Sequence, residues 1–207
     1  MICSAWVGTK TMGSNVHRKL AVCTLRSMEQ ADVATIHGWM NNEEMQAKLE
    51  DQALSSDEID AKLEQLVGCD PLADKQGGFV VDYDGRAIGF IHLMWINWIS
   101  RTGEVDLMVN PELLRSMLAF NVLQKAGELA FEQLNLNKIY AYVFASNKDS
   151  IGLLKRVMRV EATQKAGRRP ATGDEDVHVV SLFAEDYVKT LTRMRWPGYV
   201  PHKRKAQ

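Results

Sequence analysis

The stretch from Glu104 to Ser150 carries the residues whose types and spacing could do chemistry. Glu104 starts a short apolar segment, which runs through a turn at residues 110–111 into a long helical segment; the β-rich segment 138–144 and Asn147 follow. Two parallel strands joined by one helix form a βαβ unit. The strand-to-helix turn of such a unit often binds a phosphate, because backbone N–H groups of the helix point at it. The pattern therefore predicts a βαβ unit whose turn keeps the position of a phosphate site but has lost its glycines.

The other polar side chains give weaker signals. Five histidines and three cysteines show no metal-ligand spacing, so we predict no metal site. Cys23 lies on a predicted strand without a neighbour in sequence that would lower its pKa, which favours a buried strand residue over a nucleophile. His92, Trp95 and Trp98 lie on or just after a strand, where they could wall a substrate pocket or pack on a half-buried sheet face. His37, on the first predicted helix, is expected to be a satisfied core or rim histidine.

Hydrophobic periodicity places these residues on alternating strands and helices. It predicts strands over 17–26, 78–82, 86–95, 102–109, 138–144, 160–164 and 177–183, and helices after Ser27, from Ser55 or Ser56, after residue 111, over 150–158 and over 184–194. Ser27 is predicted to cap the first helix with Gln30 as its capping-box partner. Asp84-Gly85 between two apolar runs predicts a tight hairpin. The order indicates an α+β, mixed-sheet domain over 17–194, with an N-terminal arm (1–16) and a basic tail (195–207).

The element order and a series of residues from Glu104 to Arg159 resemble the GCN5-related N-acetyltransferase (GNAT) superfamily. Within it, the chain looks most similar to the ribosomal-protein-alanine acetyltransferase branch. The matching residues are Glu104, Pro111, Glu112, Ala119, Leu123, the AFEQL of 130–134, Leu136, Ile139, Asn147, Ser150, Leu154 and Lys155. The resemblance spans residues 18–190. It implies a central twisted, mostly antiparallel sheet with one parallel βαβ crossover, flanked by helices.

The resemblance also implies an activity, the transfer of an acetyl group from acetyl-CoA to a primary amine. Related enzymes often hold a carboxylate at the position of Glu104, where it takes the proton of the amine. The alternative for Glu104 is an edge-strand carboxylate paired with Arg101 or Arg86. Asn147 and Ser150 match positions that contact the pantetheine arm, and Ser150 matches one that can protonate the leaving thiolate. Asn147 could equally be a helix N-cap.

Further cofactor contacts are implied by the same resemblance. Backbone groups of Met108 and Val109 would pair with the pantetheine between parted strands. The residues facing the diphosphate would be Arg115, Ser116, Met117, Leu118 and Ala119. The tyrosine general acid of some relatives has no counterpart in 148–159.

Two departures from the family pattern concern these cofactor segments. The family loop reads Q/R-x-x-G-x-G/A, and residues 114–119 (LRSMLA) keep only the final small residue. Side chains in this loop obstruct close approach of the diphosphate to backbone N–H groups. Met158-Arg159 also replaces the usual Gly-Phe. Two alternatives therefore stay open: a catalytically impaired binding or structural protein (accessory or viral), and a transferase that uses a non-CoA acyl donor.

Composition limits the remaining partners. The 207 residues are 46% hydrophobic, enough for one sizeable core, and a net charge of −1 provides no general attraction to nucleic acid or to an anionic membrane. The basic clusters at 165–169 and 202–205 are expected to be a solvated loop and tail; an acidic partner or the adenosine 3′-phosphate of CoA is the alternative. Cysteine usage and the lack of a signal peptide or membrane span predict a cytoplasmic protein. The expected acceptor is a small amine or a peptide N-terminus, and the resemblance adds a homodimer.

Overall fold

The computed structural model describes residues 23–46, 54–114, 116, 118–168 and 174–193, and the predicted arm and tail lie outside these ranges. Its strands are β1 (Cys23–Ser27), β2 (Gly77–Tyr83), β3 (Arg86–Asn97), β4 (Thr102–Val109), β5 (Lys138–Phe144), β6 (Arg159–Arg168) and β7 (Glu175–Phe183). Its helices are α1 (Gln30–Met40), α2 (Glu43–Gln46), α3 (Ser56–Glu64), α4 (Pro71–Asp74), α5 (Leu118–Gly127), α6 (Lys148–Leu154) and α7 (Ala184–Arg193). A 3-10 turn (Pro111–Leu113) precedes α5, and a π-helical turn (Glu128–Gln133) extends it.

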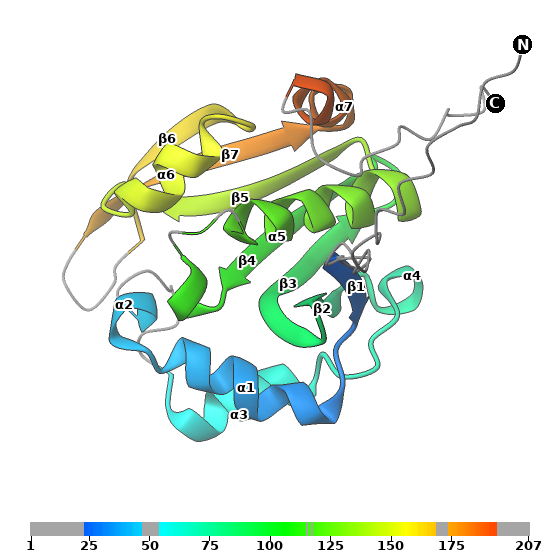
Figure 1. The fold of residues 1–207 in the computed structure, drawn as a ribbon. Helices are drawn as coiled ribbons and strands as arrows, with labels where there is room; N and C mark the ends of the chain where they lie inside the picture. Colours follow the sequence, from blue (N-terminus) through cyan, green and yellow to red (C-terminus); the bar gives the residue numbers. More distant parts are fainter. Residues whose placement is uncertain (1–22, 47–53, 115, 117, 169–173, 194–207) are drawn as a thin grey trace, which may run out of the picture.

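The strands form one sheet in the order β1-β2-β3-β4-β5-β7-β6. Every neighbouring pair is antiparallel except β4 and β5, which α5 joins as a parallel crossover. Figure 1 shows α5 lying along the sheet over β3 and β4, with α1 and α3 side by side below. The predicted mixed sheet with a single βαβ unit is therefore confirmed.

Alternating residues of the strands divide the core between the two faces of the sheet, as the period of two requires. Val81, Ile91 and Val105 pack with α5 in one cluster of buried side chains. Val80 and Phe90, on the opposite face, pack with α1 and α3 in a second cluster. Each face of the sheet is thus covered by its own helices.

The hairpin between β2 and β3 forms where Asp84-Gly85 predicted it. Both residues have positive φ, 53° for Asp84 and 76° for Gly85, as a type I′ turn requires. Gly89, further along β3, allows α5 to approach closely: an added Cβ would lie 2.3 Å from a methyl carbon of Val122. The position of α5 over β3 therefore depends on a residue without a side chain.

The helix caps confirm one prediction and correct another. Ser55 caps α3 as expected, accepting a hydrogen bond from the backbone N–H of Glu58 in a reciprocal capping box. The predicted cap at Ser27 with Gln30 is wrong, because β1 continues through Ser27. The capping box of α1 is formed by Glu29 and Asp32, two residues further on.

Candidate active site

β4 and β5 separate shortly after they meet, and this creates the central cleft. Their parallel pairing covers only Thr102 with Lys138, Gly103 with Ile139 and Glu104 with Tyr140. Beyond Glu104, the edge of β4 that faces β5 no longer pairs with it. The predicted parting of the fourth and fifth strands is thereby confirmed.

The cleft encloses about 2120 Å³ and extends along both parted strands. Its walls include residues from β3, β4 and β5, the start of α5 and α6, and side chains of α3. Pockets for drug-sized ligands usually occupy roughly 300–1,000 Å³. This cleft therefore has room for a long cofactor and a second substrate together.

Glu104 lines the cleft at the last paired position of β4. The edge-strand alternative for this residue is wrong, since β4 lies between β3 and β5. Arg101 instead donates hydrogen bonds to the backbone oxygen of Asn135 at 2.6 Å and to its Oδ1 at 2.5 Å. Arg86 is at the far end of β3, eight residues from Met94, the cross-strand partner of Glu104.

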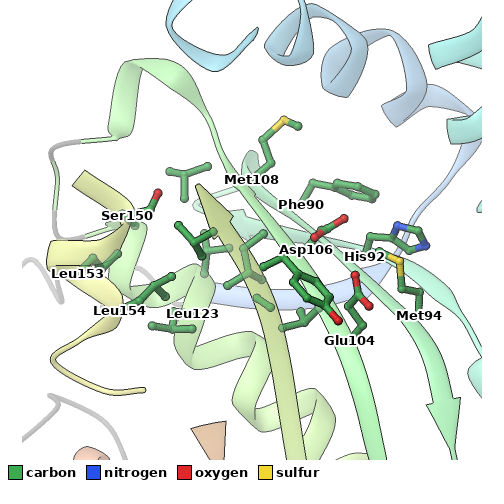
Figure 2. A pocket seen from close by; sticks show the side chains of 18 of the residues that line it. Phe90, His92, Met94, Glu104, Asp106, Met108, Leu123, Ser150, Leu153 and Leu154 are labelled. Atoms are coloured by element: carbon green, nitrogen blue, oxygen red, sulfur yellow. The ribbon is translucent and has the colours of Figure 1, made fainter. Parts of the chain in front are cut away.

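Register places further side chains on the same face of the sheet as Glu104. Asp106, two residues along β4, lies opposite His92 of β3 in the strand register. Figure 2 shows Glu104 and Asp106 beside His92 and Met94, with Phe90 and Met108 further along the strands. Sequence reasoning did not single out Asp106, although the period of two along 102–109 puts it on the face of Glu104. The cleft therefore holds two carboxylates from adjacent positions of one strand face.

Two tyrosines of β5 lie near Glu104. Tyr140 pairs in register with Glu104, and its ring makes an edge contact with that of Tyr142, with 6.1 Å between centroids. Burial raises the pKa of Tyr140, and the charges of Glu104 and Tyr142 raise it further. Tyr142 lies two residues beyond Tyr140, the last residue of β5 that pairs with β4, and it lines the cleft. It was also missed from sequence, because its proximity to Glu104 depends on strand pairing.

The tryptophans have different environments around a bulge in β3. Trp95 and Ile96 together oppose Gly103, and Trp95 has φ 51° with a side chain that is 73% exposed. Trp98 packs against the main core and also lines the cleft, so both interpretations hold for it. Trp95 lines the rim of the cleft.

Asn147 and Ser150 line the cleft at the start of α6. The Oδ1 atom of Asn147 accepts a hydrogen bond from the backbone N–H of Ser150 at 3.1 Å, so the helix-cap interpretation of Asn147 is confirmed. Figure 2 shows Ser150 with Leu153 and Leu154 on the α6 side of the cleft.

The start of α5 is held by a serine. The Ser116 hydroxyl donates to the backbone oxygen of Leu113 at 2.7 Å and accepts from the backbone N–H of Leu118 at 3.1 Å. Leu118 and the buried Ala119 line the cleft. Arg115 and Met117 lie outside the described residues. The Ser116 hydroxyl oxygen thus accepts the hydrogen bond of one backbone N–H, that of Leu118, at the place predicted for a diphosphate.

Met108 and Val109 lie on the part of β4 that does not pair with β5. The Met108 side chain is buried in the cluster under α1 and α3, and Val109 packs against the other face. Their other edge pairs with Phe90 and Gly89 of β3. Both residues line the cleft, but the N–H and C=O of Met108 point toward β3, so only those of Val109 face the parted edge.

Cys23 and Lys165 do not line the cleft. Cys23 accepts a hydrogen bond from Asn121 at 3.1 Å, and burial raises its pKa, which agrees with the non-nucleophilic prediction. The predicted loop is wrong at 165–168, because β6 continues through these residues, and Lys165 pairs with Asp176 at 2.6 Å. Residues 169–173 and 202–205 lie outside the described residues. In the part that the structure describes, no three potential metal ligands come together, and no helix is long and apolar enough to span a membrane.

A parted parallel strand pair with a helix N-terminus beside it and a carboxylate at the fork is the geometry of an acyl-CoA-dependent transferase. Residues 23–157 match the model of the acetyltransferase (GNAT) domain, and the chain belongs to this family. The predicted superfamily, fold and N-acetyltransferase activity, with acetyl-CoA as donor and an amine as acceptor, are confirmed.

Similar proteins include spermidine N(1)-acetyltransferases. The one from Vibrio cholerae serotype O1 is 31% identical over 140 residues, which cover 67% of this chain and 79% of that protein. The one from Escherichia coli K12 is 27% identical over 139 residues, covering 64% and 70%. The crystal structure of the Vibrio cholerae spermidine N-acetyltransferase in complex with CoA and spermine superposes with a TM-score of 0.70 at 25% identity, covering 80% of this chain and 98% of that one.

Proposed function

We propose that the protein acetylates a primary amine of a polyamine, with Glu104 as the general base. The observation that carries this proposal is the pair of carboxylates at Glu104 and Asp106, on one face of β4 at the fork of the strands. Alternate residues of a strand are roughly 7 Å apart. This spacing is close to that of the two ammonium groups of a short alkyl diamine, so one carboxylate can face the reacting amine and the other a second cation.

The residues around the fork fit the cofactor. A buried backbone group needs a hydrogen-bonding partner. The N–H of Asn110 donates to Ile88 of β3, so the alternation along β4 also turns the N–H and C=O of Met108 toward β3. Those of Val109 face the parted edge, where they can bind an amide-bearing chain such as pantetheine. The N-terminus of α5, at Ser116, Leu118 and Ala119, would face the diphosphate, since helix N-termini favour anions. Arg115 and Met117 belong to the same segment and are part of this proposal.

Acetyl-CoA supplies the thioester carbonyl that the amine attacks. Glu104 accepts the proton that the acceptor ammonium must lose, and general-base assistance of this kind contributes typically ~10²–10⁴-fold. Holding amine and thioester in one cleft adds the advantage of proximity. Ser150 would donate a proton to the departing sulfur, while Asn147 orders the turn that presents it. Tyr142, on the cleft face of β5, is a second proton donor to be compared with Ser150.

A peptide N-terminus is the second candidate acceptor, favoured by the motif series that resembles the ribosomal-protein-alanine branch. The spermidine acetyltransferases among the relatives support the polyamine instead. Family membership also favours catalysis with acetyl-CoA over an accessory protein or a different acyl donor. The homodimer and the cytoplasmic location remain predictions.

The test is a panel of acceptors assayed by release of CoA thiol, with the product identified by mass. Spermidine and spermine are expected to be acetylated with kcat/KM at least tenfold above butylamine and above a peptide that begins with alanine. Asp106→Asn should reduce the preference for spermidine over butylamine, with Asp84→Asn, in the β2–β3 turn, as the matched control. Equal rates with butylamine, or a preference for the peptide, would contradict the polyamine proposal.

A further inference from the structure

A relay of serine, histidine and aspartate joins α1 to α3, and none of its three members lines the cleft described above. The Asp60 Oδ1 atom lies 2.5 Å from Nδ1 of His37, and the Ser56 hydroxyl lies 2.9 Å from Nε2 of the same ring. The two ring nitrogens therefore contact a carboxylate on one side and a hydroxyl on the other. The prediction of a satisfied histidine is therefore confirmed, and its two partners are the carboxylate and hydroxyl of a candidate catalytic arrangement.

Helix geometry explains why the three groups meet. Ser56 and Asp60 are four residues apart on α3, so both side chains project from one face of that helix. The neighbouring Ile36 and Ile59 are buried in the cluster where α1 packs on α3, and this packing holds the two helices together. The side chain of His37 is only 14% exposed, so its ring is held between the two helices.

This order of groups defines the proton positions. A carboxylate can only accept, so Nδ1 of His37 carries the hydrogen toward Asp60, and Nε2 of the neutral ring accepts from the Ser56 hydroxyl. A serine hydroxyl is a weak nucleophile until an adjacent base takes its proton. A base oriented by a third group is the general arrangement that activates it. We propose that Ser56 is an activated nucleophile that accepts acyl groups from small neutral esters, at a second acyl-transfer site separate from the acetyl-CoA cleft.

The surroundings of Ser56 define the class of substrate. Ser56 is the first residue of α3, where backbone N–H groups and the helix dipole stabilise developing negative charge. The capping box uses the N–H of Glu58 and leaves those of Ser56 and Asp57 outside it. The carboxylates of Asp57 and Glu58 stand in the same turn, so they disfavour anionic substrates. A small neutral ester on the open surface satisfies both conditions.

The reaction balances as ester hydrolysis. The Ser56 oxygen bonds to the acyl carbon while its proton passes to Nε2 of His37. The bond to the alkoxide then breaks, and the alkoxide leaves with that proton. Water adds to the acyl carbon, gives a proton to His37, and the Ser56 oxygen leaves and recovers it. The products are a carboxylic acid and an alcohol.

The simpler interpretation is a hydrogen-bonded bridge that ties α3 to α1. A bridge predicts that Ser56 is no more reactive than any other exposed serine, whereas an activated nucleophile reacts at a rate that depends on His37. The two interpretations therefore require the same contacts and differ only in the reactivity that they predict for Ser56.

The experiment follows p-nitrophenyl acetate with the full chain in the absence of acetyl-CoA, so that its outcome does not depend on the proposed polyamine activity. A burst of nitrophenolate stoichiometric with protein is expected, with one acetyl group mapped by mass spectrometry to Ser56. Ser56→Ala should abolish the burst, and His37→Gln should slow acylation by ~100-fold or more. Ser100→Ala, in the exposed β3–β4 loop, is the matched serine control. Melting temperatures check that each variant folds.

Three results would overturn the proposal. They are the absence of a burst, acylation mapped only to lysines or other serines, and an acylation rate in His37→Gln equal to that of the unaltered chain. The last result establishes the structural bridge, because the ring would then have no role as a base.

Discussion

Replacing Glu104 by glutamine removes the proposed base while keeping the size of the side chain. Glu104 is at the last paired position before β4 and β5 part, so the amide should preserve the strand and the shape of the cleft. The acceptor amine reaches the cleft as an ammonium ion at neutral pH, because alkyl ammonium groups have pKa values of about 10.4. Without the carboxylate, only the small fraction of free amine can attack.

The register partner of Glu104 cannot take over the role of its carboxylate. Tyr140 is the register partner of Glu104, but burial raises its pKa, so its phenol keeps its proton at neutral pH and cannot serve as a base. The loss of a general base typically costs ~10²–10⁴ in rate, about 3–5 kcal/mol of transition-state stabilisation. We therefore expect kcat/KM of Glu104→Gln to fall by ~100-fold or more at pH 7.

The assay is release of CoA thiol with spermidine as acceptor, between pH 6 and 10. The rate of Glu104→Gln should rise about tenfold per pH unit, because it follows the free amine, and it should approach the unaltered enzyme only near pH 10. Glu112→Gln, in the exposed turn after β4, is the matched control and should behave as the unaltered chain. A Glu104→Gln enzyme within threefold of full activity at pH 7, or with an unchanged pH profile, would refute the role of Glu104.

Three further predictions concern stability. Gly89→Ala should destabilise by ~1–3 kcal/mol in urea unfolding, because the new Cβ would lie 2.3 Å from a methyl carbon of Val122; an unchanged midpoint would contradict the close packing. Ser55→Ala removes the side-chain acceptor of the α3 capping box and should cost ~0.5–2 kcal/mol by the same measurement. Hydrogen bonds from Arg26 lower the pKa of Asp32, so their stabilisation is complete above the ordinary aspartate pKa and is lost as the pH falls through the lower value of the folded state. The melting temperature should accordingly drop less between pH 5 and 2 in Asp32→Asn than in the unaltered chain.

The sequence predicted the strands around the cleft well, because their periodicity and turn residues are local. The bounds predicted for β4 and β5 are those observed, and Asp84-Gly85 formed the expected hairpin. The first helix cap was misplaced, since Ser27 and Glu29 compete for the same function within three residues. Only the pairing of β1 with β2 through Ser27 decides between them.

The parts of the site that escaped prediction depend on contacts between distant segments. Tyr142 lies near Glu104 only because β4 pairs with β5. Asp106 is a candidate site residue only because the two strands part just before it. The relay brings together His37 and Ser56, which are 19 positions apart in sequence. Their contact depends on how α1 packs on α3, and hydrophobic periodicity does not specify that packing. Ser116 likewise acquires its capping contact from the fold of the turn before α5.

The central claim is that the parted strands and the start of α5 bind acetyl-CoA, and calorimetric titration with acetyl-CoA tests it most directly. Ser116→Asp is the informative variant. An aspartate can still accept the backbone N–H of Leu118 and cap α5, yet it places a negative charge where the diphosphate is expected. Ser116→Ala is the matched neutral control. We predict micromolar binding to the unaltered chain, little change in Ser116→Ala, and at least tenfold weaker binding in Ser116→Asp. No binding at millimolar acetyl-CoA, or equal affinity in Ser116→Asp, would contradict the account.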